Sequence, residues 1–147
     1  MAKDCLILPP PAADLPAIVR MADVAIAAGS TNKPWPYFQF AKSLAEYRQG
    51  RFESAAEWSE KVAAIKGDWY RAVQAHMVLA MAQQQLHKTN EARATLAKGI
   101  EIADMRFPKA GKGSLDEQWN DWIIAHALMR EAQALIEGGP ETSRQTK

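Results

Sequence analysis

The side chains that could do chemistry in this sequence are a single cysteine, three histidines and two carboxylate pairs. Cys5 stands beside Asp4, whereas a reactive thiolate needs nearby positive charge and a partner histidine. His76, His87 and His126 have no histidine four residues away and no neighbouring glutamate in a metalloprotease pattern. We therefore expect no metal site and no cysteine nucleophile.

The carboxylate pairs Asp116/Glu117 and Glu57/Glu60 fall on polar helix surfaces. Charged residues at such positions are ordinarily solvated or favour the start of a helix. No nucleophile, base and orienting group can be assembled from these residues. The sequence therefore predicts no catalytic residue and no bound cofactor, and we expect that the chain is not an enzyme.

One short segment, Gly111-Lys112-Gly113-Ser114, suggests phosphate binding. A P-loop requires G-x-x-x-x-G-K-[ST] after a strand, whereas here the lysine is followed by glycine and no strand precedes it. The glycine-rich loop, strand lysine, catalytic aspartate and Asp-Phe-Gly motif of a kinase are absent as well. We interpret residues 105–113 as a solvated basic loop.

The composition describes one globular domain of 147 residues, with 18 Lys+Arg against 17 Asp+Glu and a formal net charge of +1. This balance gives no electrostatic footprint for nucleic acid. No run approaches the roughly 18 apolar residues of a membrane-spanning helix, so we expect no membrane insertion. With one cysteine and no signal-peptide pattern in the proline-rich stub 1–13, the expected location is cytoplasmic.

Apolar residues recur at intervals of three and four along the chain, which predicts helices and no strand. Asp14 and Thr89 are candidate helix caps, and Ser114 with Glu117 forms a candidate capping box. The tail 138–147 is polar and expected to be disordered. The predicted helices span 14–28, 35–49, 52–65, 69–86, 90–104 and 115–137.

An internal repeat relates two of the predicted helix pairs. Residues 39–65 align with 76–102 at a period of 37 residues, and Gly50 then falls on His87. Small residues coincide in both helices of the pair, Ser43 with Ala80 and Ala55 with Ala92. Because a bulky side chain would force the helices apart, these positions predict antiparallel pairs that approach closely.

The segment LAEYRQGRFESAAEW resembles the tetratricopeptide repeat (TPR), a helix-turn-helix unit of about 34 residues. In the second copy His87 and Thr89 replace the turn glycine and the aromatic residue. The resemblance implies an all-α fold of antiparallel helix pairs stacked as a short TPR-like α-solenoid of about six helices. The domain would span 14–137, with units at about 36–66 and 73–104 and flanking helices at 14–28 and 115–137.

The stretches YFQFAKSLAEYRQGRFESAAEW, AHMVLAMAQQQLHKTNEARATLAKGIEIA and DWIIAHALMREAQALIEG also resemble the C-terminal tetratricopeptide-type region of large bacterial serine/threonine protein kinases. In that family the chemistry belongs to an upstream kinase domain, which this sequence lacks. The resemblance implies a non-catalytic signalling scaffold that binds proteins. The alternative is a kinase fragment whose catalytic domain is missing here.

In the repeat family the first helix of each pair lines a concave groove that holds a protein or peptide. The chaperone-binding members use Lys and Asn there to hold a carboxylate, and such a clamp is not expected here. An aromatic stripe at helical spacing can equally be core. By resemblance, the groove-lining residues are Tyr37, Phe40, Leu44, Tyr47, Arg48, Gln74, Met77, Met81 and Gln84.

The ends of a short helix stack leave apolar faces open. Self-association through these faces is therefore a further expectation. Trp119 and Trp122 stand three residues apart on the last predicted helix. They could close the core as a cap or form an exposed apolar patch, and capping is favoured because large exposed patches are rare on monomers.

Overall fold

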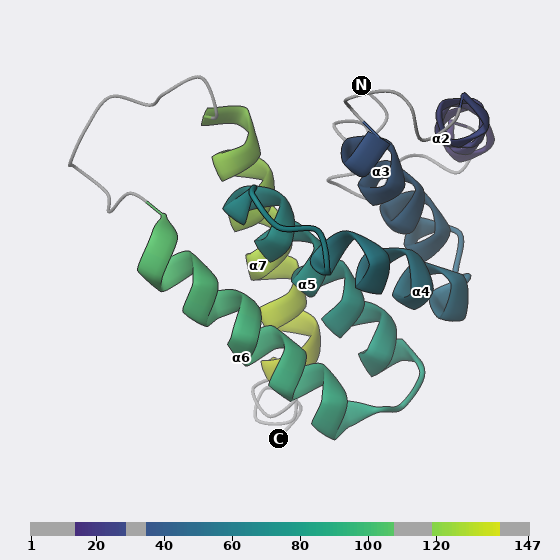
Figure 1. Ribbon diagram of the computed structural model, residues 1–147. Coiled ribbons are helices and arrows are strands. Elements are labelled where there is room, and N and C mark those ends of the chain that lie inside the picture. The colour runs from purple at the N-terminus through teal and green to yellow at the C-terminus, as the bar shows by residue number, and fades with distance from the viewer. Residues whose placement is uncertain (1–13, 29–34, 108–118, 139–147) are drawn as a thin grey trace.

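The computed structural model describes residues 14–28, 35–107 and 119–138, and every regular element in these ranges is a helix (Figure 1). This confirms the all-helical prediction, with six helices and no strand in the described ranges. The helices are α2 (Leu15–Ala27), α3 (Trp35–Arg48), α4 (Phe52–Ala63), α5 (Trp69–Gln85), α6 (Thr89–Arg106) and α7 (Trp119–Glu137).

Two helical hairpins, α3–α4 and α5–α6, have turns with the same hydrogen bonds. The amide of Gly50 donates to the carbonyl three residues earlier (3.0 Å), and that of Arg51 to the carbonyl five residues earlier (2.9 Å). His87 and Lys88 make the same two bonds, at 3.1 and 2.9 Å. This is the Schellman ending of a helix, and it needs a left-handed residue, here Gly50 (φ +81°) and His87 (φ +63°). The second turn is therefore as tight as the first although it lacks the glycine.

The small residues of the repeat lie where the helices meet. Ser43, Ala80, Ala55 and Ala92 are all fully buried. Gly99 marks another close approach, because a Cβ there would overlap the terminal methyl of Met77 and lie 3.0 Å from the Cβ of His76. The absence of a side chain at position 99 thus sets how closely α6 packs on α5.

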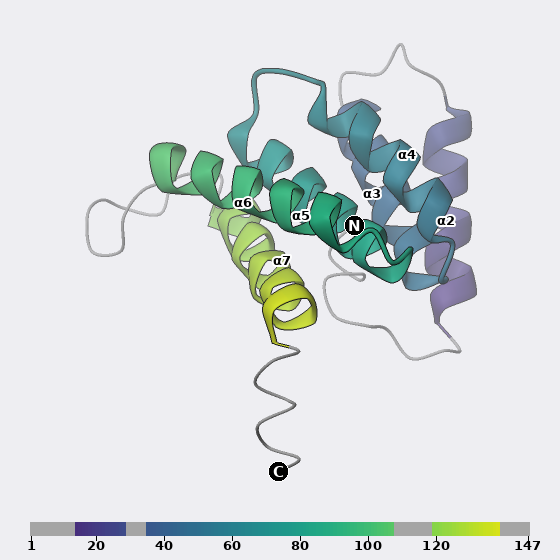
Figure 2. The same cartoon turned by 90° about the horizontal axis from the view of Figure 1, so that it is seen from below.

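Helix α5 is the centre of the molecule. It packs against α4, α6 and α7 and touches α3, and its residues 70–82 are buried all round. Helix α2 packs on α3 at one end of the row, far from α6 and α7 (Figures 1 and 2). One apolar core cluster includes residues from all six helices. The hairpins are therefore joined into a single packed body rather than standing apart.

The helix caps differ in part from the expectation. The Asp14 side chain makes no capping hydrogen bond to α2, and Thr89 is the first helical residue of α6 rather than its cap. The backbone of Lys88 already closes the preceding Schellman turn, which leaves no room for a separate cap residue. Asp68 caps α5 instead, because its Oδ1 accepts the amide of Arg71 at 3.1 Å. The predicted capping box, Ser114 and Glu117, lies outside the described residues.

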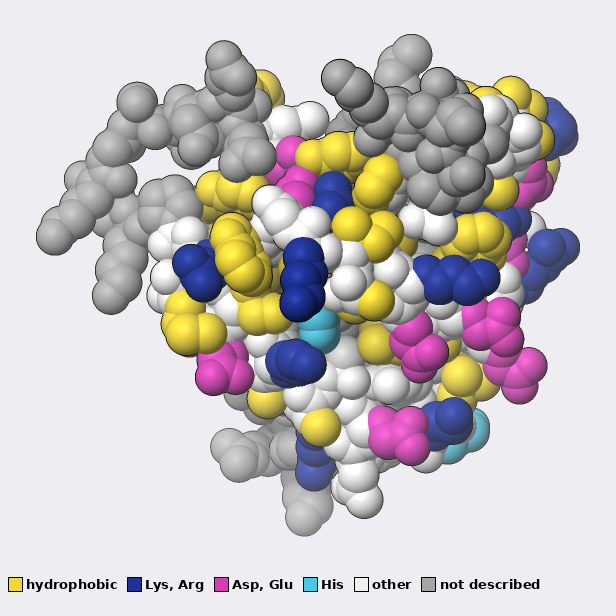
Figure 3. Space-filling model, viewed as in Figure 1, with side chains coloured by type: hydrophobic (Ala, Val, Ile, Leu, Met, Phe, Trp, Pro, Cys, Tyr) yellow, Lys and Arg dark blue, Asp and Glu magenta, His cyan; other side chains and the backbone are white. Residues whose placement is uncertain are grey.

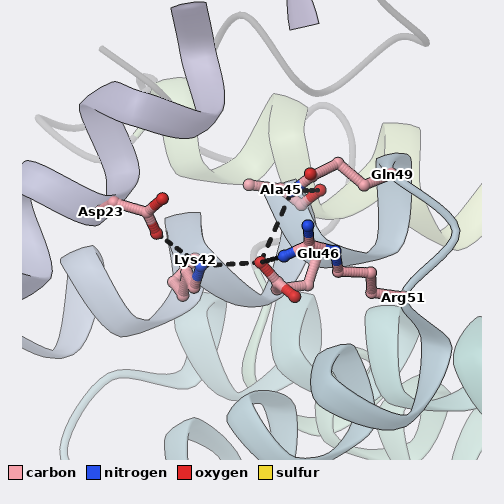
Figure 4. A network of polar contacts seen from close by, with 6 residues as sticks. All are labelled: Asp23, Lys42, Ala45, Glu46, Gln49 and Arg51. Atoms are coloured by element: carbon pink, nitrogen blue, oxygen red, sulfur yellow. Dashed lines mark hydrogen bonds and ion pairs between the residues drawn. The ribbon is translucent and has the colours of Figure 1, made fainter. Parts of the chain in front are cut away.

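A chain of polar contacts fastens α2 to the first hairpin (Figure 4). Lys42 of α3 donates to Asp23 of α2 at 2.5 Å and to buried Glu46 at 2.7 Å, and Arg51 lies 3.7 Å from the same carboxylate. Burial lowers the pKa of Lys42, but its bonds to the two carboxylates outweigh burial and raise it above the ordinary value. Lys42 thus stays charged and holds α2 against α3.

Candidate functional site

The structure places none of the nine predicted groove residues on an open surface. Tyr37, Arg48 and Gln84 are partly buried. The other six are buried: Phe40, Leu44, Tyr47, Gln74, Met77 and Met81. The expectation of an open groove is corrected accordingly: Met77 points at Gly99 of α6, α3 is packed against α2, α4 and α5, and α7 packs on α5.

Helix α7 lies along α5 on the side that does not face α4 (Figures 1 and 2). It packs mainly against α5 and only lightly against α6. Its buried stripe recurs every four residues, as expected for an amphipathic helix with one face in a core. The stripe consists of Ile124, Leu128, Ala132 and Ile136. We call the surface on which α7 lies the α3–α5 face: α5 makes most of the contacts and contributes Gln74, and α3 contributes Arg48.

Two polar contacts fix α7 on the α3–α5 face. The guanidinium of Arg48 donates two hydrogen bonds to the carboxylate of Glu131, one of them at 2.8 Å from Nη2 to Oε2. The side chain of Arg48 is only 5% exposed, so the pair is largely shielded from water on the arginine side. Near the other end of α7, the Gln74 amide donates to the backbone carbonyl of Asp121 at 3.0 Å. Helix α7 therefore crosses from α5 to the end of α3.

Aromatic side chains join α6 to the first half of α7. Tyr70 stacks on Phe107 (centroids 4.6 Å apart), Phe107 meets the ring of His126 (5.7 Å), and His126 stacks on Trp122 (3.8 Å). Nδ1 of His126 also donates to the carbonyl of Trp122 at 2.9 Å. Trp122 is thus a half-buried packing residue, whereas Trp119 is 49% exposed and does not close the core.

A polar cluster lies where α5 begins, and sequence reasoning missed most of it. The Tyr37 hydroxyl donates to Asp68 at 2.6 Å, and this bond, together with burial, raises the pKa of Tyr37 to about 12. Arg71 lies over the Tyr37 ring, and its guanidinium is 3.5 Å from the Asp68 carboxylate. The residue is buried, with only 7% of its surface exposed, yet its Nε has no hydrogen-bond partner. The available signal was that Arg71 is the only Lys, Arg, Asp or Glu in α5.

The remaining candidate residues are not brought together into one site. His76 is buried and bonded to the backbone, His87 forms the exposed turn, and Glu57 and Glu60 are exposed on α4. Within the described ranges no three His, Cys, Asp or Glu side chains gather as a metal would need. Cys5, Asp116, Glu117 and the segment 111–114 lie outside the described residues. No described helix has the length and apolar character needed to cross a membrane.

Comparisons with protein-family models, with curated proteins and with solved structures found no match to this chain.

Proposed function

We propose that the chain is a non-catalytic protein-binding module whose α3–α5 face accepts an amphipathic helix. The observation that carries this proposal is the position of α7, which packs on α5, buries one apolar stripe in the core and pairs its Glu131 with Arg48 of α3. An amphipathic helix on an apolar surface is a common mode of protein recognition, read as anchors three or four residues apart. In this reading α7 occupies the surface until a partner's helix takes its place.

The repeat supports the same reading. Two hairpins with matching turns, buried small residues at matching positions and first helices that touch one another are the features expected of a short TPR-like α-solenoid. Such a stack presents its first helices on one side, and α3 and α5 are those helices. The resemblance to the C-terminal region of bacterial serine/threonine kinases makes a signalling scaffold the expected setting, in which a separate catalytic domain supplies the chemistry.

The contacts of α7 define the partner's chemistry. A competing helix needs aliphatic residues at four-residue spacing and a carboxylate that reaches Arg48. Arg48 has two oxygens of one carboxylate within hydrogen-bond reach, which a bidentate pair matches better than a single acceptor does. The partner is therefore an acidic amphipathic helix rather than an extended or basic peptide.

Competition between α7 and a free peptide of the same sequence tests the proposal. A fluorescein-labelled peptide of residues 119–138 is titrated with the full chain and with its Glu131→Ala variant, and binding is followed by anisotropy. The tethered α7 competes at a high effective concentration, so the wild-type chain should bind weakly. Loss of the Arg48 pair weakens this competitor, and we expect affinity for the peptide to rise about tenfold, or about 1.4 kcal/mol.

Glu137→Ala is the matched control, because Glu137 is exposed on the same helix. It should bind the peptide as the wild-type chain does, and a peptide carrying Leu128→Asp should bind none of the proteins. Equal affinity of the two glutamate variants would contradict the proposal. Phosphotransfer from ATP above background by the full chain would contradict the non-catalytic part of it.

A further inference from the structure

A pocket of about 350 Å³ opens between the two hairpins, at the end of α4 and the start of α5. Its α5 wall comes from Trp69, Ala72, His76 and Leu79, a different side of the helix from Gln74, which contacts α7. Lys98 and Ile102 of α6 complete it. Pockets of this size with a mainly apolar lining and a few polar groups are the usual form of a small-molecule site.

His76 lines this pocket, and a hydrogen bond defines the roles of its two ring nitrogens. Its Nδ1 donates to the carbonyl of Ala72 at 2.7 Å, so in the neutral ring the proton is on Nδ1 and Nε2 carries the lone pair. Burial, and then the positive charge of Lys98, lower the pKa of His76 below its ordinary value. Near neutral pH, Nε2 is therefore a hydrogen-bond acceptor. The missing side chain of Gly99 lets α6 approach the Cβ of this histidine.

The charged groups around the pocket favour an anion. Lys66 and Lys98 line it, and of its two carboxylates Asp68 is already held by Tyr37 and Arg71. Glu60 remains as one exposed carboxylate on the rim. In the view of Figure 3, a histidine side chain near the centre has Lys or Arg side chains next to it and hydrophobic ones nearby.

Trp69 provides the apolar wall. It is 45% exposed, and Arg106 lies over its ring at 4.2 Å, which orients the indole beside the mouth. An exposed tryptophan at a pocket with an alanine and isoleucine lining offers a flat surface to a ring or a short aliphatic chain. The pocket thus combines three features: an apolar wall at Trp69, the cations Lys98 of α6 and Lys66 of the α4–α5 turn, and the acceptor nitrogen of His76.

We propose that this pocket binds a small organic acid, with its carboxylate at Lys98, its apolar body against Trp69 and a hydrogen-bond donor on Nε2 of His76. The proposal does not depend on the helix-binding function, because the pocket and the α3–α5 face lie on different sides of α5. A hydroxylated aromatic acid satisfies all three contacts. A cationic or purely polar solute makes neither the contact with Lys98 nor the contact with Trp69.

The test uses three probes on the full ¹⁵N-labelled chain: 4-hydroxyphenylacetate, phenylacetate and 4-hydroxyphenylacetamide. Each is titrated while amide and indole shifts are recorded. We expect 4-hydroxyphenylacetate to bind most tightly and to shift the signals of Trp69, His76 and Gly99. Removal of the hydroxyl should weaken binding by about twofold to tenfold, in line with one lost hydrogen bond, and replacement of the carboxylate should weaken it by at least as much.

Lys98→Gln and Lys88→Gln form a matched pair of variants, because both lysines are exposed and only Lys98 lines the pocket. Lys98→Gln should weaken the binding of 4-hydroxyphenylacetate about fivefold or more and leave the affinity for 4-hydroxyphenylacetamide unchanged. Lys88→Gln should change neither affinity. Three results would each overturn the proposal: equal affinity for the acid and its amide, an unchanged affinity of Lys98→Gln for the acid, or chemical-shift changes confined to residues away from the pocket. Chemical denaturation of both variants verifies that they remain folded.

Discussion

Position 99 shows how one residue sets the distance between two helices. The repeat has Val62 at the matching position of the first hairpin, and both residues are buried. A valine at 99 would force the buried Met77 side chain to move, because even a Cβ would overlap its terminal methyl and lie 3.0 Å from the Cβ of His76. The close contact of α5 and α6 therefore depends on the absence of a side chain there.

Gly99→Ala should lower the free energy of unfolding by about 1 kcal/mol. Alanine favours the helix by about 1 kcal/mol, but overpacking against the buried Met77 methyl costs about 1–3 kcal/mol. In a Met77→Ala background the overlap disappears, and the same substitution should become neutral or stabilising. Urea denaturation of the four proteins in this cycle measures the change, and destabilisation of the same size in both backgrounds would contradict it.

His76 gives the stability a dependence on pH. Burial lowers its pKa in the folded state, so the unfolded chain, with a pKa near 6.5, binds the proton first as pH falls. The free energy of unfolding is therefore unaffected by His76 protonation above pH 6.5. It decreases as the pH falls from 6.5 toward the pKa of His76 in the folded state. His76→Asn keeps a donor for the Ala72 carbonyl but does not titrate. We expect the wild-type chain to lose more unfolding free energy than the variant below pH 6.5, and parallel profiles would refute this.

The turns between helices are local structures that the sequence specifies closely. Gly50 and His87 have the same left-handed backbone, which costs a residue with a side chain about 1–2 kcal/mol relative to its preferred conformation. The hydrogen bonds of the turn and the packing of α5 on α6 hold His87 in this conformation. The second turn thus stores a small strain that the first does not.

Exchanging the two turn residues tests this strain. His87→Gly should raise the free energy of unfolding by about 0.5–1 kcal/mol, and Gly50→His should lower it by about 1–2 kcal/mol. Both positions are exposed, so lost packing does not enter the comparison. Guanidinium denaturation measures both values, and a destabilised His87→Gly variant would show that the histidine side chain contributes more than its strain costs.

Helix α7 is attached by its buried stripe, and shortening one side chain of that stripe should destabilise the fold. Leu128 is fully buried in the core cluster, so Leu128→Ala should cost about 2–4 kcal/mol of unfolding free energy. Ile123 lies on the same helix but is 44% exposed, and Ile123→Ala should cost under about 1 kcal/mol. Thermal or chemical denaturation distinguishes them. Similar costs for the two variants would mean that α7 is not anchored by this stripe.

At the scale of the whole molecule, the two ends of the helix row differ. Helix α7 covers one side of α5, whereas α2 contacts α3 and leaves Met21 (44% exposed) and Val24 (70% exposed) on its outer face. Ala17 and Ala28 extend these two residues into an exposed apolar stripe. The spacing of 17, 21, 24 and 28 reads the same in both directions, so two copies of α2 can pair antiparallel with matching residues opposite one another.

We therefore expect weak self-association through α2. Sedimentation velocity over a concentration series should show a reversible monomer–dimer equilibrium in the wild-type chain, and Val24→Glu should abolish it. The control is Asn90→Glu, which places the same charge on an exposed residue of α6 and should leave the equilibrium unchanged. A strict monomer at the highest concentration, or equal effects of both variants, would exclude this interface.

The sequence alone determined the helices, their turns and the pairing of α3 with α4 and of α5 with α6. These features depend on contacts within a few residues, on a 3.6-residue period and on small residues at matched positions, so each can be found in a short stretch of sequence. The caps depart from this local prediction: Asp14 stands at the start of α2 without a capping bond, Thr89 is the first residue of α6 rather than its cap, and Asp68 caps α5.

Only the tertiary structure decided which face of α3 and α5 is covered. The predicted groove residues became buried because distant segments pack on them: α3 lies against α2, α4 and α5, Met77 of α5 faces Gly99 of α6, and α7 packs on α5 and pairs Glu131 with Arg48. The pocket at His76 likewise needs α4, α5 and α6 at once. The residue pattern within a helix specifies that it has an apolar face. Which partner covers that face depends on contacts between distant segments, and the local pattern does not contain them.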